Sequence, residues 1–505
     1  MRTPSGTAAL AGGVAMAFAL LVVLLLSEAG APFPPAALGQ AAVEALPGAV
    51  SVPLIELLQH WAERLLIVAI VAAYLLGGCA TAVAAARSRV ASGAVVGLGA
   101  LPWVVTVASA QVLAGKKVDL GADLFACAVG AAAFYAALAF LLAAERVATP
   151  ATLARRRFLI GAVAAAGIVA LGSTALGSTL RAADRVRSVA LAIRHLRSKE
   201  SVPPADPSFA SIAHLTPRIT SNADHYEVDE EIIKPLVDIA TWKLDVSGEV
   251  EQPFSLTWNE LLDLPAVERP HTLECISNEI GGDLTSTAIW AGVPMADLLA
   301  RAQPKPSAFA VVLTSVDGYS DSFPIATALD GDTLVAYLMN GVTIPQEHGY
   351  PVRALIPNIY GMKNVKWLTR IEVVTYEYQG YWQQRGWSNV ATYNTHVRID
   401  VPIAAARPEG GRVTVAGIAF AGDRGISRVQ VSTDGGKTWS DAVLESPVGR
   451  EAWRRWRYEW AATAGRYRVV ARATDGQGEV QTSVQRPPFP NGATGYPAVD
   501  VTIAS

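Results

Sequence analysis

The 505-residue sequence predicts a multi-domain protein with transmembrane α-helices at the N-terminus, an α+β domain in the middle and an all-β sandwich at the C-terminus. Residues 1–180 are rich in Ala, Leu, Val and Gly, whereas the remainder has ordinary globular composition. Mixed strand and helix patterns follow, and beyond residue 395 short strand patterns stand alone. We therefore expect four parts: a membrane domain (1–180), a linker (181–216), a central domain (217–394) and a C-terminal domain (395–505).

Five apolar stretches contain no charged side chain, and each is near the ~20 residues that a helix needs to cross a hydrocarbon core. They are Ala8–Leu26, Leu65–Ala86, Val90–Gly115, Leu124–Ala144 and Phe158–Leu180. The first stretch is also compatible with a cleaved secretory signal, but its basic region is Arg2 alone and its apolar run is long. We therefore expect a multi-pass domain in the cell membrane. Since His60 is the only histidine before residue 190, paired haem ligands are absent from this half and anchoring is its expected role.

The positive charges predict how these helices are oriented. Arginines lie between the second and third stretches and between the fourth and fifth: Arg87, Arg89, Arg146, Arg155, Arg156 and Arg157. This arrangement places the N-terminus inside and everything after Leu180 in an extracytoplasmic position. The run Arg155–Leu159 also has the form of an internal twin-arginine export signal; the alternative, arginines that hold a helix end at the cytoplasmic surface, gives the same topology.

The central part combines strand and helix patterns. Arg181–Glu200 could extend the last apolar helix before the Pro-rich SVPPADPS ends it. We expect two strands and a short helix within 242–265, further strands at Ala308–Ser315 and Val352–Ile356, and helices at Met295–Arg301 and Thr333–Met339.

The C-terminal part contains four regularly spaced strand-like runs, RVTVAGIAF, ISRVQVS, WRRWRYEW and RYRVVARATD. In the third run, Trp456, Tyr458 and Trp460 fall on one face because side chains alternate along a strand. Asp434-Gly435-Gly436 is a hairpin-turn signal. A sandwich of about 100 residues fits this pattern.

Cys275, in the stretch TLECISNE, is the one cysteine outside the apolar half, where Cys79 and Cys127 lie. A nucleophilic role needs a histidine base, for which His225, His271, His348 and His396 are available. A zinc site needs clustered ligands that the sequence does not offer. A thiolate can also bind a redox metal whose other ligands come from a cofactor, and an inert buried thiol is the remaining alternative.

The segment Leu273–Gly282 (LECISNEIGG), followed by AIWAGVP (288–294), resembles the sulfite oxidase family of molybdopterin enzymes. Met339–Val373 is similar to the pterin-binding segment of that family, and GYWQQRGW (380–387) to a motif of its bacterial members. Val415–Trp439 resembles the Ig-like molybdenum-cofactor dimerisation domain. The resemblance covers about residues 217 to 505, with its motifs in the family's order, and implies a Mo-molybdopterin oxidoreductase.

This resemblance implies roles for individual residues. Cys275 would be the one protein ligand to molybdenum, and Trp387 would occupy the position of an active-site tyrosine. Buried anions need Arg, Lys and backbone N–H donors, which suits a pterin phosphate. The implied pterin-binding residues are Asn222, Tyr226, Cys275, Asp317, His348, Arg353, Asn364, Val365 and Lys366.

The implied chemistry is two-electron oxygen-atom transfer, but the sequence departs from true sulfite oxidases at Ile280, where they have a sulfite-binding arginine. A small S- or N-oxide is therefore expected as substrate, with a sulfite-like molecule as the alternative. No C-x-x-C-H motif occurs, so a separate cytochrome or quinone-linked partner would exchange the electrons. A homodimer fits the C-terminal resemblance, and the net charge of −3 argues against nucleic acid. A cysteine-dependent hydrolase and a non-catalytic membrane-tethered binding protein are the competing functions.

Overall fold

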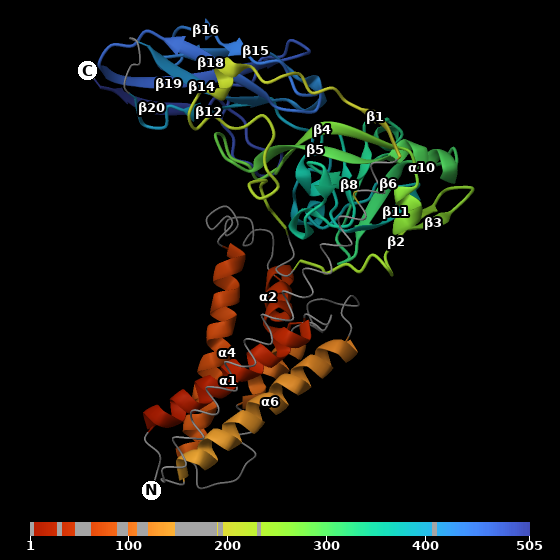
Figure 1. Cartoon of the computed structure of the whole chain (residues 1–505), viewed down its shortest axis with the longest axis vertical. Helices are drawn as coiled ribbons and strands as arrows, with labels where there is room; N and C mark the ends of the chain where they lie inside the picture. The colour runs from red at the N-terminus through yellow and green to blue at the C-terminus, as the bar shows by residue number, and fades with distance from the viewer. Residues whose placement is uncertain are drawn as a thin grey trace. The chain divides into compact units, whose positions relative to one another are not determined.

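The computed structural model describes residues 5–27, 33–45, 62–87, 99–108, 120–146, 189, 195–229, 234–406 and 412–504. The chain forms two compact units (Figure 1). One contains Met1–Ala183 with Asp229–Lys234, and the other contains Asp184–Val228 with Pro235–Ser505. Each unit is described by itself.

The first unit is helical. Its elements are α1 (Ser5–Ser27), α2 (Pro34–Ala45), α4 (Ala62–Arg87), α6 (Leu120–Arg146) and a shorter apolar helix, Gly99–Ala108. Among the described residues, Ala8–Ser27, Leu65–Ala86 and Leu124–Leu141 are long and apolar enough to cross a membrane. Three of the five predicted stretches are thus confirmed as helices of spanning length. The third is described only over Gly99–Ala108, and Phe158–Leu180 and the twin-arginine-like run lie outside the described residues.

The second unit begins with two sheets that share the central domain. The first has the order β1-β4-β5-β8-β10, with β9 paired to β8. Its strands are β1 (Leu196–Lys199), β4 (Ala266–Glu274), β5 (Thr285–Pro294), β8 (Leu334–Met339), β9 (Val342–Thr343) and β10 (Arg353–Leu355). The second has the order β3-β2-β11-β6-β7, made of β2 (Lys243–Gly248), β3 (Phe254–Thr257), β6 (Ala310–Ser315), β7 (Ser320–Pro324) and β11 (Leu368–Val374).

Short helices connect these strands: α8 (Pro207–Ala210), α9 (Trp258–Leu262), α10 (Met295–Ala302), α11 (Ile325–Ala328), η3 (Gln346–His348), η4 (Gly361–Lys363) and η5 (Gln383–Arg385). Thr257 begins α9 with a capping box, since its side chain accepts from the Glu260 amide while Glu260 accepts from the Thr257 amide. The predicted strands at 308–315 and 352–356 and the helix at 295–301 are confirmed.

Two sequence-based expectations are wrong. Thr333–Met339, expected as a helix, contains β8, and all six residues of that strand are buried. A short apolar run fits a buried strand and a buried helix equally, and here β5 and β10 on either side select the strand. The helix extension towards Glu200 is also wrong, because Leu196–Lys199 forms β1 and pairs in parallel with β4. The predicted linker segment thus contributes a strand to the central sheet.

The C-terminal part is a two-sheet sandwich (blue in Figure 1). One sheet has the order β12-β14-β18-β17 and the other β13-β20-β19-β15-β16. The strands are β12 (His396–Val401), β13 (Ala405–Ala406), β14 (Val413–Phe420), β15 (Ile426–Ser432), β16 (Ser440–Asp441), β17 (Val443–Leu444), β18 (Arg454–Trp460), β19 (Gly465–Asp475) and β20 (Ala498–Ile503), with η6 (Gly422–Arg424) between β14 and β15. Trp456 and Trp460 are buried in the sandwich core and Tyr458 packs against it, as the alternation predicts.

Candidate cofactor site

Cys275 follows the last residue of β4 and begins the turn that leads into β5. Its amide donates to the Leu284 carbonyl at 2.9 Å, and its carbonyl accepts from the Asn278 amide at 3.0 Å. The Asn278 side chain ties the two ends of the turn together, donating to Glu274 Oε1 at 3.1 Å and accepting from the Leu284 amide at 3.1 Å. The turn thereby fixes where the thiol stands.

A glycine pair completes this turn. Gly281 has a φ of +77°, a conformation that side chains with a Cβ rarely adopt. A Cβ on Gly282 would collide with Asn278 Oδ1, the atom that holds the Leu284 amide. The sequence ECISNEIGG is therefore needed as a unit to build the turn.

The Cys275 thiol is buried, with 8% of the residue exposed, and Ser277 Oγ lies 3.0 Å from its Sγ. Burial raises the pKa of this thiol, while hydrogen bonds from Ser277 and the positive charge of Lys366 act to lower it. No described histidine hydrogen-bonds the sulfur. Since a lone buried thiol stays protonated, a positively charged group is needed to hold it as a thiolate.

Three of the predicted residues, His348, Arg353 and Lys366, meet where β10 begins. The guanidinium of Arg353, at the start of β10, donates to the carbonyl of His348 at 3.0 Å and to that of Asn364 at 3.1 Å. Lys366 Nζ donates to the Glu347 carbonyl at 2.8 Å. The segments 346–349 and 364–366 are therefore held together by cationic side chains.

The segment 222–226 supplies the other wall. His348 Nε2 lies 2.8 Å from the Asn222 carbonyl, and the His225 ring meets the His348 ring edge to face at 5.0 Å. The Asn222 side chain bonds to Asn340, with 2.7 Å between Asn340 Nδ2 and Asn222 Oδ1. Tyr226 packs against the core of the first sheet, and its amide donates to Ser286 Oγ at 3.0 Å. We call His225, His348, Arg353 and Lys366 the anion cluster.

Burial and mutual repulsion keep the histidines of the anion cluster neutral. The pKa of His348 is lowered to about 4, first by burial and then by the charges of Lys366 and Arg353, against the Asn222 hydrogen bond. The pKa of His225 lies well below its usual value, first because of burial and then because of His348 and Arg353. Neither His348 Nδ1 nor His225 Nε2 has a hydrogen-bond partner within the described part of the chain. The other nitrogen of each ring faces a backbone carbonyl and carries the proton, so these two nitrogens can donate to an anion only when the ring is protonated, a state that a bound anion would favour.

The remaining predicted cofactor residues flank this cluster. Asn364 is buried and accepts from the Ile356 amide at 2.6 Å, and Val365 accepts from the Ala354 amide at 2.9 Å. These bonds align the segment with β10. Asp317 lies in the β6–β7 turn, where its Oδ1 accepts from the Tyr319 amide at 2.7 Å. The neighbouring Val316 amide donates to the Trp367 carbonyl at 3.0 Å, so this turn lies beside Lys366.

Trp387 belongs to a different neighbourhood. Its ring meets the Phe489 ring edge to face at 5.2 Å, and its buried Nε1 has no hydrogen-bond partner among the described residues. Phe489 belongs to residues 485–495, which we call the junction loop and which lie between β19 and β20. The Ile280 side chain reaches the same loop, because a Cβ on Gly495 would be 2.8 Å from Ile280 Cδ1. The C-terminal domain thus covers the turn that carries Cys275.

Several buried polar residues were not assigned to the cofactor site from the sequence, although His225 and His396 were named as possible bases for the thiol. His225 is one of them, and its position inside the SNADHYE motif was the available signal. Glu274 and His396 form a second group, with 3.3 Å between Oε2 and Nδ1. Burial raises the pKa of Glu274 to about 8 and lowers that of His396 to about 4, so the pair is neutral. No local pattern predicts it, because β4 and β12 meet only in the folded chain.

The residues present fit a molybdopterin. A single buried thiol suits a metal whose other sulfur ligands come from the cofactor. The anion cluster suits a phosphate, because the cationic Arg353 and Lys366 lie beside two histidine rings that can donate once a bound anion favours their protonated form. The two are neighbours, since the charge of Lys366 acts on the Cys275 thiol.

Comparison with known proteins agrees with this geometry. Residues 231–382 match the oxidoreductase molybdopterin binding domain, and residues 386–486 match the Mo-co oxidoreductase dimerisation domain. The chain is 32% identical over 355 residues to mitochondrial sulfite oxidase of Mus musculus, covering 60% of this chain and 63% of the relative. It is 31% identical over 288 residues to nitrate reductase [NADH] 1 of Oryza sativa subsp. japonica, covering 45% of this chain and 31% of the relative.

The alignment spans less than two thirds of the length of the mouse sulfite oxidase. Among solved structures, the sulfane dehydrogenase SoxCD from Paracoccus pantotrophus superposes with a TM-score of 0.50 at 22% identity, covering 58% of this chain and 85% of that one. That likeness shows the fold. The two matched domains and the sulfite oxidase relatives lead to one assignment: the chain belongs to the sulfite oxidase family of molybdopterin-dependent oxidoreductases, whose cofactor is Mo-molybdopterin.

Proposed function

We propose that this protein is a membrane-anchored oxidoreductase that carries out two-electron oxygen-atom transfer at a molybdenum bound by Cys275. The observation that carries the proposal is the placement of one buried thiol, fixed by the Asn278 turn, next to the anion cluster. When bound, the molybdopterin supplies the oxygen-atom and electron transfer.

The residues of the chain have separable roles in this proposal. Cys275 would hold the metal. Arg353 and Lys366 would hold the phosphate, joined by His225 and His348 in their protonated form. Asn222, Tyr226, Asp317, Asn364 and Val365 would line the pterin. Because Arg353 already bonds two backbone carbonyls, it also fixes the distance between the two segments that surround the anion.

We propose a neutral S- or N-oxide as the substrate, with sulfite as the less favoured alternative. Ile280, Trp387 and Phe489 make the junction with the C-terminal domain apolar. Trp387 Nε1 contributes one buried donor without an acceptor. A neutral oxide oxygen would accept from such a donor, whereas a sulfite dianion needs cationic groups.

The cysteine hydrolase is the weaker alternative. A nucleophilic cysteine needs a base within hydrogen-bonding reach, and the described partner of Cys275 Sγ is Ser277 Oγ. Burial also raises the pKa of the thiol, which works against a free nucleophilic thiolate. A non-catalytic binding protein is also the weaker alternative, because the anion cluster beside a single buried thiol suits a charged cofactor.

The three apolar helices support membrane association, and we propose that the catalytic domain lies on the extracytoplasmic side. The arginines at 87, 89 and 155–157 support this orientation. A protease added to intact cells should then release the domain that follows residue 195, and protection until lysis would contradict the orientation. The matched dimerisation domain supports a homodimer, and a separate electron-transfer protein completes the proposal.

The decisive experiment measures molybdenum and pterin in the purified full-length protein and in Cys275→Ala. We expect about one molybdenum per chain in the wild type, together with oxide reduction by a reduced viologen dye. The variant should retain pterin but lose at least about a thousand-fold in turnover, since the metal would lose its protein ligand. Equal turnover by both proteins would rule out the mechanism, and a wild type without molybdenum would favour the hydrolase.

A further inference from the structure

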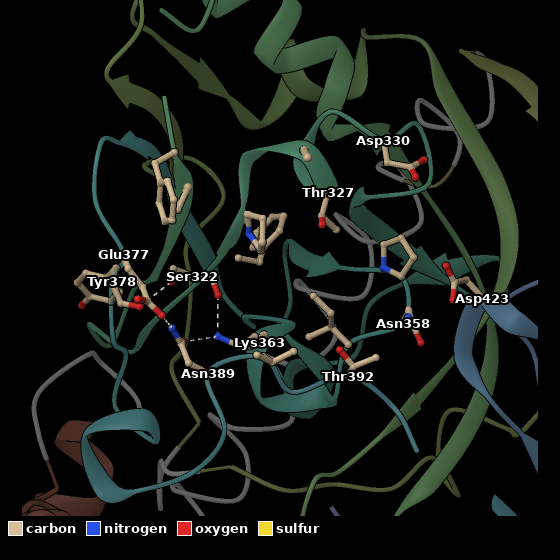
Figure 2. Close-up of a pocket in the computed structure, with 18 residues that line it drawn as sticks. Ser322, Thr327, Asp330, Asn358, Lys363, Glu377, Tyr378, Asn389, Thr392 and Asp423 are labelled. Atoms are coloured by element: carbon tan, nitrogen blue, oxygen red, sulfur yellow. Dashed lines mark hydrogen bonds between the residues drawn. The ribbon is translucent and has the colours of Figure 1, made fainter. Parts of the chain in front are cut away.

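A second pocket, apart from Cys275, opens between the central domain and η6 of the C-terminal domain. It encloses about 500 Å³ and is lined by β6, β7, α11 and the segments 357–359 and 389–392 (Figure 2). Lys363 forms part of its floor, donating to Asp321 at 2.7 Å, to the Ser322 carbonyl at 2.7 Å and to Asn389 Oδ1 at 3.2 Å. Asp321 is fully buried and balances the charge of Lys363. The floor is thus a closed, neutral network.

The rim of this pocket is acidic. Glu377 lies near Asn389 at one end, and Asp330 and Asp423 lie at the other, as Figure 2 shows. Asp423 is balanced in part by Arg450, whose guanidinium lies 3.7 Å from Asp423 Oδ2 and 3.5 Å from Asp332 Oδ2. Because these carboxylates surround one neutral floor, the pocket presents a negative potential to solvent.

Large apolar side chains are exposed on the same rim. Phe309 is 54% exposed and Val390 is 73% exposed, and both line the pocket. Leu329, at the end of α11, and Tyr376, beside Glu377, are also exposed. The Phe309 amide donates to the Val374 carbonyl, which joins two of these segments. Exposed apolar side chains interspersed with charged ones are the composition of a protein interface rather than of an enclosed small-molecule site.

The pocket floor also lies close to the proposed metal ligand. Ile359 lines the pocket, and two residues later a Cβ on Gly361 would be 3.1 Å from the Glu274 carbonyl oxygen. With standard backbone dimensions, the Cα atoms of Ile359 and Cys275 are separated by at most about 15 Å. Electron transfer weakens steeply with distance, so a redox group held over this pocket would have a short route to the site.

We infer that this rim, formed by Phe309, Val390, Asp330, Glu377 and Asp423, is the docking surface for a separate electron-transfer protein with a lysine-rich face. The inference rests on the proposed function, which requires such a partner. Lysine side chains of the partner would meet the rim carboxylates, and an apolar residue at its centre would cover Val390. A lipid surface or a small cation is not favoured, because neither would use both the exposed apolar side chains and the acidic rim.

The test uses the detergent-purified holoenzyme and an oxidised, lysine-rich mitochondrial cytochrome c as the probe, with binding measured calorimetrically at low salt. Val390→Lys places a cation at the centre of the surface and should weaken binding at least about ten-fold. Ile403→Lys is the matched control, since Ile403 is also 73% exposed but lies on the sandwich; it should bind within about two-fold of wild type. Asp330→Asn with Glu377→Gln should weaken binding and flatten its salt dependence, whereas Asp263→Asn with Asp500→Asn should not.

Equal affinity of Val390→Lys and Ile403→Lys for the cytochrome would contradict the proposed docking surface. A wild type that does not bind the cytochrome would contradict it as well. Molybdenum content and oxide turnover with a viologen dye are measured on the same samples. The dye needs no docking surface. Normal dye turnover in a wild type that does not bind the cytochrome would therefore contradict the docking surface alone, whereas a wild type without molybdenum would contradict the proposed function.

Discussion

The two ends of the catalytic region are built by opposite means. The anion cluster is cationic, and its side chains donate to backbone carbonyls. Arg353, for example, joins two segments of the central domain by donating to the carbonyls of His348 and Asn364. The junction between Ile280, Trp387 and the loop at 485–495 is apolar, and the C-terminal domain provides half of it. The first end gathers two cationic side chains and two histidines, and the second has one buried donor, Trp387 Nε1, without an acceptor among the described residues.

This difference separates affinity for the cofactor from choice of substrate. Burying several cationic groups costs free energy when they have no partner. Charge-assisted hydrogen bonds to a multiply charged anion offset that cost, so a site built from such groups is favourable when the anion is bound. A small neutral molecule gains binding free energy only from the burial of its apolar surface and from one or two hydrogen bonds. Substitutions in the anion cluster should therefore lower the cofactor content, whereas substitutions at the apolar junction should change which substrate is used.

The largest effect is expected for Arg353→Ala. Its loss leaves the His348 and Asn364 carbonyls buried without a donor and removes a charge from the anion site, at a cost of about 3 kcal/mol or more. We expect pterin content to fall at least about ten-fold and the melting temperature to fall with it. Arg353→Lys should recover only part of the loss, because an ammonium does not reproduce the planar fork.

The exposed Arg370 on β11 provides the control for this prediction. Arg370→Ala should keep the wild-type pterin content and melting temperature. Full pterin content in Arg353→Ala would show that the anion is held elsewhere.

The contrast between the two ends also explains what the sequence could predict. Cys275, His348, Arg353 and Lys366 lie in two compact motifs, so a linear pattern reveals them. His225 and His396 become part of the site only because segments distant in sequence meet, as when the His396 ring on β12 approaches Glu274 on β4 at 3.3 Å. The same limit applies to β8, whose apolar run fits a helix until its two neighbouring strands are known. The contact between the junction loop and Ile280 was likewise hidden, because it joins residues over 200 positions apart.

A medium effect is expected for Ile280→Arg at the apolar end. A guanidinium here would provide the cationic donor that sulfite needs, so the ratio of kcat/KM for sulfite to that for a neutral sulfoxide should rise about ten- to a hundred-fold. Pterin and molybdenum content should not change, because the anion cluster is untouched. Ile280→Lys would test charge without the fork, and Ile280→Gln would test size without charge. An unchanged ratio in all three variants would place the substrate away from this residue.

The smallest effect is expected for Trp387→Phe. The change removes a buried donor that has no partner, so the gain from removing an unsatisfied group offsets the small cavity and stability should stay within about 1 kcal/mol of wild type. If that donor binds the oxide oxygen, KM should rise about ten-fold while kcat stays nearly constant, the pattern of an interaction made equally in the ground and transition states.

Trp242→Phe is the matched control, because Trp242 is equally buried but its Nε1 donates to the Leu368 carbonyl at 3.1 Å. That variant should lose stability by about 1 to 3 kcal/mol, since the acceptor is left unpaired, and should keep its KM. The two tryptophans thus separate a donor that awaits a ligand from one already used by the fold. Equal losses of stability with unchanged KM in both variants would make Trp387 a packing residue, and the apolar end would then have to select its substrate by shape alone.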